Sequence, residues 1–265
     1  MQKINLKLYE FDRLKRFRPQ TRTFNTESNL YIYPQNNKKR ILKVFYNMNY
    51  NKILTINLLN YYKNDIDIEE LSLDSDLVSI ENKPAGILSD YIDGTVLSNI
   101  IYDKGISINY KIDILKKVGV VLDKMKKARK KINDFYIGDL HEDNIIVCGD
   151  TIKIMDMDSS KIMDNEPSQS KYLTRLARRK KIDSIIIPNE STDNYCFNMM
   201  ILNALFSKDI SKLSIDEFYR YIEYLYSIDI DINLINNFNN MYLGNTLNLH
   251  NQLDSLKKLE KVYLK

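Results

Sequence analysis

Three polar residues near the middle of the chain have the types and the spacing that phosphoryl transfer uses. Asp139 stands five residues before Asn144, and Asp156 ends an apolar run that follows the turn residues Gly149 and Asp150. A carboxylate such as Asp139 can orient an acceptor hydroxyl, while Asn144 and Asp156 supply the hard oxygen ligands that Mg²⁺ prefers. Each residue alone fits an ordinary polar loop, but the three together favour a catalytic site.

Apolar patterns on both sides of these residues predict the elements that must position them. Strands are predicted over 29–33, 40–45, 77–81 and 85–92, a hairpin over 145–155, and helices over 51–63, 95–103, 109–132, 192–206, 214–227, 232–242 and 247–262. The first 90 residues are therefore rich in strands with one helix, and nearly everything after residue 95 is helical. This change predicts an α+β fold in which a small sheet precedes a larger helical part.

Lys43 is a charged residue in an otherwise apolar strand. Regular alternation places its side chain on the same face as Ile41 and Phe45, which is an unusual place for a solvated cation. The alternative is a surface lysine on an edge strand, because the residues at 38–40 are also basic. The alternation favours a specific role for the Lys43 ammonium.

The segment 136–147, followed by 152–156, resembles the catalytic segment of the protein-kinase-like superfamily. Its Gly138-Asp139-Leu140-His141 sequence is closer to aminoglycoside- and choline-kinase-type and bacterial kinase-like members than to most eukaryotic protein kinases. The resemblance extends over about residues 24–206. It implies one two-lobed domain, with a small N-terminal antiparallel sheet lobe carrying one helix at 1–89, a hinge at 90–95 and a larger helical C-terminal lobe at 96–265.

The resemblance implies that ATP and Mg²⁺ lie between these two lobes. Lys43 would then pair with the α- and β-phosphates of the nucleotide. The backbone groups of Asp90 and Ile92 would hydrogen-bond the adenine edge in the hinge. The alternative for the hinge is a strand that simply ends in a turn at Gly94.

Three further residues take a role from the same resemblance. His141 would contact a phosphate or brace the loop, although a lone histidine also fits a plain polar loop. Asp158 would assist the metal, because Asp156-Met157-Asp158 replaces the usual Asp-Phe-Gly triplet and resembles the small-molecule kinases. Asp193 opens a helix, where the family has an aspartate that hydrogen-bonds the backbone of the catalytic loop; helix capping alone also explains it.

The sequence departs from the family in the parts that cover the phosphates. There is no glycine in residues 1–85, so the usual glycine-rich loop is missing. The corresponding turn is expected near 25–29, where Ser28 could offer its backbone N–H to a phosphate. The helix predicted over 51–63 has no acidic residue, so the usual glutamate partner of Lys43 is not evident.

The segment between Asp156 and Asp193 corresponds to an activation or substrate loop. It contains the hydroxyl residues Ser168, Ser170, Tyr172 and Thr174. It also contains a run of basic residues, Lys171, Arg175, Arg178, Arg179, Lys180 and Lys181. These can bind an acidic or phosphorylated substrate, or they can form a solvated helix face.

The function that the resemblance implies is an ATP- and Mg²⁺-dependent phosphotransferase, with a protein Ser/Thr hydroxyl as the acceptor. One alternative is a small-molecule kinase of the aminoglycoside or choline type. Another is a pseudokinase, which would bind nucleotide or a protein partner without turnover. A nucleic-acid-binding protein that uses the basic residues is a third alternative, and the absence of a defined RNA-binding motif counts against it.

Composition limits the remaining classes. The 265 residues have a net charge of +4, which does not by itself indicate nucleic acid or membrane binding. Two cysteines and two histidines, in no metal-type spacing, do not favour a structural zinc site. No apolar run is long enough for a membrane span, and the unclustered cysteines favour a reducing, cytoplasmic setting. The sequence leaves the oligomeric state open.

Overall fold

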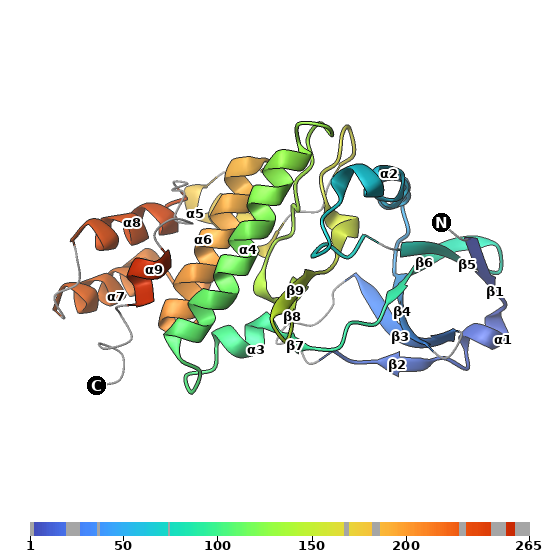
Figure 1. Cartoon of the computed structure of the whole chain (residues 1–265), viewed down its shortest axis with the longest axis horizontal. Coiled ribbons are helices and arrows are strands. Elements are labelled where there is room, and N and C mark those ends of the chain that lie inside the picture. The colour runs from blue at the N-terminus through green and yellow to red at the C-terminus, as the bar shows by residue number, and fades with distance from the viewer. Residues whose placement is uncertain are drawn as a thin grey trace.

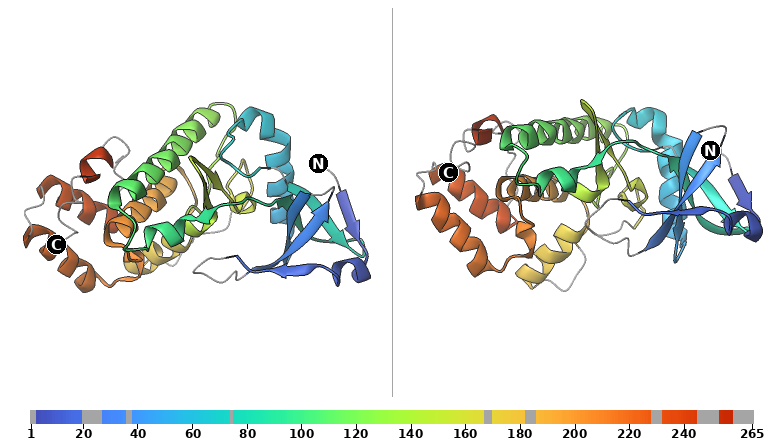
Figure 2. Two further views of the ribbon diagram at one scale, coloured as in Figure 1. Left: turned by 60° about the horizontal axis from the view of Figure 1, so that its bottom comes forward. Right: turned by 90° about the horizontal axis from the view of Figure 1, so that it is seen from below.

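The computed structural model describes residues 3–19, 27–35, 38–73, 75–166, 170–181, 186–227, 232–244 and 253–257. Over these residues the chain has an α+β fold. Strands β1 to β6 and helix α2 form a sheet region at one end, and helices α3 to α9 with strands β7 to β9 form a helical region at the other (Figure 1). The views in Figure 2 show the same separation.

The sheet region is built on six described strands in the order β1-β5-β6-β4-β3-β2. Their bounds are Lys3–Leu6 for β1, Lys15–Phe17 for β2, Ser28–Gln35 for β3, Lys38–Phe45 for β4, Ser75–Ile80 for β5 and Lys83–Asp90 for β6. All neighbouring pairs are antiparallel except β1 and β5, which are parallel.

The prediction of a purely antiparallel sheet with one helix is wrong in two respects. Strand β1 pairs in parallel with β5, and the short helix α1 (Leu8–Phe11) accompanies α2. Strands β1 and β2 were not predicted, because they have only four and three residues. Such lengths are too short to show an alternating apolar pattern.

Strand β4 lies inside the sheet, where it pairs with β6 on one edge and β3 on the other, and its side chains are buried on both faces. Leu42 is fully buried on one face. Ile41, Lys43 and Phe45 alternate with it and are also buried, which excludes the alternative of a surface lysine. Helix α2 (Tyr50–Ile66) covers the face of Lys43, where its Ile56 packs against Phe45.

A second sheet of three described strands connects the two regions. Strands β7 (Thr95–Val96), β8 (Ile145–Cys148) and β9 (Thr151–Ile154) are antiparallel. Gly94 has to be a glycine, because a Cβ there would overlap the carbonyl oxygen of Val147. The main chain of Ile154 also accepts a hydrogen bond from the Ser72 N–H at 2.9 Å, so the end of β9 is joined to the sheet region.

The helical region packs around α4 and α6, which lie side by side (Figure 1). Its helices are α3 (Leu97–Ile101), α4 (Ile108–Ala128), α5 (Lys171–Lys180), α6 (Glu190–Phe206), α7 (Ile215–Ser227), α8 (Ile232–Tyr242) and α9 (Leu253–Leu256). One continuous apolar core runs through them and extends to Leu59 of α2. Within the described ranges, no helix combines the length and apolar character needed to cross a bilayer.

Most predicted spans agree with the structure within a few residues. The exceptions are α5, which was treated as part of a loop, and the span 95–103, which begins with strand β7. Of the helix predicted over 247–262, the structure describes α9 and the adjacent Lys257; the rest of that prediction lies outside the described residues.

Candidate active site

A cavity of about 660 Å³ lies where the sheet region meets the helical region. It is lined by every candidate site residue except Ser28, namely Lys43, Asp90, Ile92, Asp139, His141, Asn144, Asp156 and Asp158. Ser28 is buried at the start of β3, opposite Phe45 in the register of the sheet. Two residues of the turn expected over 25–29, Asn25 and Thr26, lie outside the described residues.

The Lys43 ammonium is held by carboxylates from two other segments. Its Nζ lies 3.0 Å from Asp158 Oδ1 and 3.3 Å from Asp156 Oδ2. Glu27, just before β3, lies 3.6 Å away. Although burial lowers the pKa of Lys43, these three carboxylates raise it above its ordinary value, so the group stays charged. The partner of Lys43 is therefore Asp158, supported by Asp156 and Glu27, and none of them is on α2.

Asp158 is a fully paired carboxylate. Its side chain is 1% exposed, and its Oδ2 lies 3.3 Å from the ammonium of Lys52. Burial raises the pKa of the Asp158 carboxyl, but Lys43 and Lys52 outweigh burial and hold the pKa below its ordinary value. In this arrangement Asp158 fixes two lysines; its role as a metal ligand stays a prediction.

Asp156 presents its carboxylate to the cavity. The residue has a positive φ of 57° at the end of β9, and its side chain is 37% exposed. Burial raises the pKa of the Asp156 carboxyl, the Asp158 and Asp139 carboxylates add to the increase, and Lys43 opposes it. The carboxylates of Asp139, Asp156 and Asp158 thus concentrate negative charge on one side of the cavity.

The loop from Asp139 to Asn144 places its two ends side by side. The Asn144 amide donates to the main-chain oxygen of Asp139 at 3.0 Å and lies 3.5 Å from its carboxylate. Residues Glu142–Asn144 form a single 3-10 turn that makes this return possible. The Met155 N–H donates to the Asn144 carbonyl at 2.7 Å, so the next residue, Asp156, lies beside the same loop.

Asp193 anchors the start of this loop. Its carboxylate accepts the N–H groups of Ile137 at 3.0 Å and of Gly138 at 3.3 Å. The contact with the loop backbone that the sequence suggested is therefore present. Burial raises the pKa of Asp193 to about 6, and the two backbone donors limit the rise.

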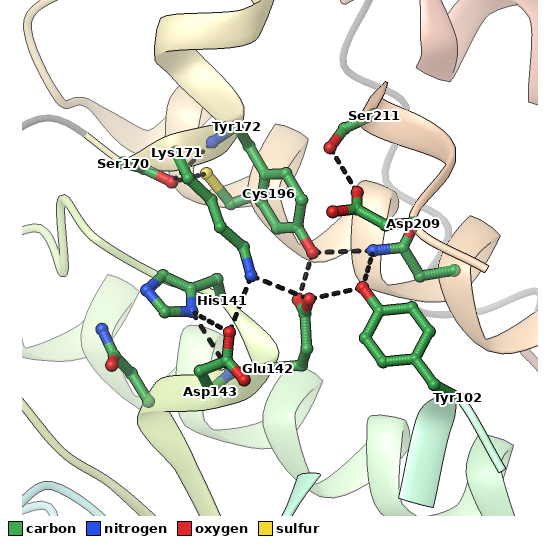
Figure 3. Close-up of polar contacts among 12 residues, drawn as sticks. Tyr102, His141, Glu142, Asp143, Ser170, Lys171, Tyr172, Cys196, Asp209 and Ser211 are labelled. Carbon is green, nitrogen blue, oxygen red and sulfur yellow. Dashed lines mark hydrogen bonds and ion pairs between the residues drawn. The ribbon is translucent and has the colours of Figure 1, made fainter. Parts of the chain in front are cut away.

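His141 has a defined ring orientation (Figure 3). Its Nδ1 accepts the N–H of Asp143 at 3.2 Å. In the neutral ring the proton is then assigned to Nε2, because an accepting nitrogen carries none. Nε2 lies 3.6 Å from Asp139 Oδ1, so His141 faces the carboxylate that was predicted to orient the acceptor.

The segment that follows β6 stays joined to β4 by one hydrogen bond. The N–H of Tyr91 donates to the carbonyl of Lys39 in the sheet at 3.3 Å. Asp90, the last residue of β6, and Ile92 lie on either side of this contact along the chain. Both residues line the cavity.

Sequence reasoning missed Glu27 and Lys52. Lys52 lies in the first turn of α2, where its Nζ is 3.2 Å from Glu27 Oε2 and 3.3 Å from Asp158 Oδ2. A signal existed for Lys52, because it precedes the buried Ile56 by one turn on the same face of the helix. Glu27 had no such signal. Glu70, an acidic residue that follows α2, pairs with Lys124.

The donor set fits a magnesium ion that the phosphates help to hold. Among the described residues, no three His, Cys, Asp or Glu side chains form a cluster that could hold a metal ion by themselves. Asn144 and Asp156 both line the cavity and offer hard oxygens, and Mg²⁺ is commonly bound by one or two side chains together with phosphate oxygens.

Two comparisons with known proteins give no match. No protein-family model matches the sequence. A search of curated proteins finds no match either.

Proposed function

We propose that this chain is an ATP- and Mg²⁺-dependent phosphotransferase that transfers the γ-phosphoryl group to a hydroxyl. The observation that carries the proposal is that Lys43 of β4 lines a single cavity together with Asp139, Asn144 and Asp156 of the distant segment 139–156. An ammonium, two hard oxygen ligands and a further carboxylate are the groups that positioning and charge stabilisation in phosphoryl transfer require.

The fold that fits this function is the two-lobed protein-kinase-like fold. In this proposal residues 1–89 form the N-terminal lobe, 90–95 the hinge and 96–265 the C-terminal lobe. Support comes from the order of elements, in which Lys43 lies on a strand before α2 and Asp139 follows the long helix α4. The Asp193 contact with the loop backbone supports the same assignment.

Each residue has one task in the proposed reaction. Lys43, held by Asp158, neutralises the nucleotide phosphates, and Asp139 orients the acceptor hydroxyl and accepts its proton. Asn144 and Asp156 would hold Mg²⁺, which supplies charge neutralisation on the phosphate oxygens when bound. The backbone of Asp90 and Ile92 would bind adenine.

The acceptor proposed first is a protein Ser/Thr hydroxyl, because the Asp193 anchor is typical of protein kinases. A small-molecule acceptor is the second candidate, and a specific observation favours it. Ser170 and Tyr172 have no exposed surface, and both are hydrogen-bonded, so this part of the segment is a packed helix start. Ser168 lies outside the described residues.

ADP release from Mg-ATP, measured for the parent protein with peptide and small-alcohol acceptors, tests the proposal. Asp139→Asn should lower turnover by about 10²–10⁴-fold, the usual contribution of a general base. The matched control is Asp150→Asn, the same substitution in the exposed turn between β8 and β9, which should keep the parent rate. A parent protein that binds ATP without turnover would favour the pseudokinase alternative, and equal rates in both variants would remove Asp139 from the mechanism.

A further inference from the structure

A buried polar network lies beside the loop from Asp139 to Asn144 (Figure 3). Its centre is the ammonium of Lys171, the first residue of α5, which lies 2.9 Å from Glu142 Oε1 and 3.0 Å from Asp143 Oδ2. Both carboxylates belong to the loop between Asp139 and Asn144. One side chain from α5 thus holds two consecutive loop residues.

Glu142 is buried, and both of its carboxylate oxygens accept hydrogen bonds. Its side chain is 1% exposed. The hydroxyl of Tyr102 donates to Oε1 at 2.6 Å, and the hydroxyl of Tyr172 donates to Oε2. Asn203 of α6 donates to the two tyrosine oxygens, at 3.1 and 2.8 Å. The loop is therefore tied to α3, α5 and α6 through one carboxylate.

The charge of Lys171 is preserved in this setting. Burial lowers the pKa of its ammonium, but the carboxylates of Glu142 and Asp143 outweigh burial and raise the pKa. Buried charges persist only when they are paired and hydrogen-bonded, which holds for all three groups. The network is thus a fixed set of charges and not a surface ion pair.

The network is connected to Asp139 and Asn144, the residues proposed to act in the reaction. The N–H of Asp143 donates to His141 Nδ1 at 3.2 Å, and His141 Nε2 faces Asp139 at 3.6 Å. On the other side, Asp143 immediately precedes Asn144, whose amide binds the Asp139 carbonyl. A shift of Asp143 would therefore move both the residue that faces Asp139 and a proposed metal ligand.

We infer that Lys171 is a positioning residue that sets the geometry of Asp139 and Asn144 by bridging Glu142 and Asp143. This inference rests on the proposed function. In many kinases the corresponding segment is ordered by a phosphate that pairs with arginines. Here the ordering cation is a lysine of the segment itself, and the neighbouring Ser170 and Tyr172 are buried, so this order needs no phosphate on either hydroxyl.

The test compares Lys171→Met with Arg175→Met, both measured for ADP release and for ATP binding. Arg175 lies one turn further along α5 and binds Asp209 and Ser211, so it is a matched cation that does not contact the loop. Lys171→Met should lower kcat by about 100-fold, the effect of a misplacement near 1 Å, and leave the Kd for Mg-ATP within about twofold. Arg175→Met should keep the parent kcat.

A second variant removes the risk that Lys171→Met fails to fold. Glu142→Gln combined with Lys171→Met leaves no unpaired Glu142 charge. The amide oxygen accepts from one tyrosine hydroxyl, and the amide NH2 donates to the oxygen of the other. It should retain the folded circular-dichroism spectrum and lose kcat to a similar extent. A folded double variant with the parent kcat would overturn the inference, as would equal loss of kcat in Arg175→Met.

Amide hydrogen exchange of residues 139–144 separates this inference from the proposed function. Lys171→Met should accelerate exchange in this loop, and Arg175→Met should not, because of these two cations Lys171 contacts the loop and Arg175 binds Asp209 and Ser211. If the parent protein has no turnover, the proposed function fails, but faster loop exchange in Lys171→Met still supports the positioning role. Unchanged loop exchange overturns the positioning role whatever the activity.

Discussion

At the scale of the residue, the site is a set of charges that stabilise one another. Lys43 and Asp158 are both nearly inaccessible, and the hydrogen bond between them joins residues 115 positions apart. Sequence spacing could locate Asp139, Asn144 and Asp156, because they lie in one continuous segment. It could not identify Asp158 as the partner of Lys43, because that pair depends on how the sheet packs on the segment after β9.

Lys111 provides a prediction at this scale. It lies on α4 with 1% exposure, and its ammonium donates to Ser207 Oγ at 2.7 Å. Burial lowers its pKa from 10.5 to about 8, although Asp103 opposes the shift. The folded protein therefore binds fewer protons than the unfolded chain between pH 8 and 10.5, so this group makes the folded state more stable as pH rises through that range.

Lys111→Met should accordingly raise the free energy of unfolding at pH 7 by about 1–3 kcal/mol, because it removes a buried charge. The difference in the free energy of unfolding between Lys111→Met and the parent protein should become smaller as pH rises from 8 to 10.5 and then stay constant. Urea unfolding of both proteins across this range measures the difference. A difference that stays constant with pH would show that Lys111 has an ordinary pKa in the folded state.

At the scale of the element, apolar periodicity predicted the long helices and the central strands well. Helix α4 and strand β4 have strong patterns and were found where expected. Helix α5 was missed because its sequence is dominated by lysine and arginine, and only Tyr172, Leu173, Leu176 and Ala177 are buried. The parallel pairing of β1 with β5 could not be read from the sequence, since it joins two short strands about 70 residues apart through tertiary packing.

The docking of α2 on the segment after Asp158 gives a prediction for the elements. Asn165 is 2% exposed and donates to Thr55 Oγ1 at 2.6 Å and to the Ser160 carbonyl at 2.8 Å. Its Oδ1 accepts the N–H of Ile162 at 2.8 Å. Asn165→Ala should lower the free energy of unfolding by about 2–4 kcal/mol, because buried partners lose their hydrogen bonds.

Thermal or urea unfolding of Asn165→Ala measures this loss, and Asn51→Ala is the matched control. Asn51 joins the same two elements through Glu166 at 3.0 Å, but the contact is exposed. The control should change stability by less than about 0.5 kcal/mol. Similar losses in the two variants would mean that burial of the Asn165 network contributes little.

At the scale of the whole molecule, the cavity exists because two regions of different architecture meet. The sheet region contributes Lys43, which is covered by helix α2. The helical region contributes the loop from Asp139 to Asn144. The change from strands to helices near residue 90 was visible in the sequence. One contact that joins the regions, between Ser72 and Ile154, involves only main-chain atoms and therefore had no signature in the side chains.

The central claim is that this cavity binds the phosphates of ATP through Lys43 with Mg²⁺, and calorimetric titration of ATP tests it most directly. The parent protein should bind ATP in the presence of Mg²⁺, and Lys43→Met should bind it roughly 10–100-fold more weakly, the loss expected for a charged hydrogen bond. Lys116→Met, which removes a lysine of α4 paired with Asp254, should bind as the parent does. No binding of ATP by the parent protein, or equal affinity in Lys43→Met, would contradict the claim.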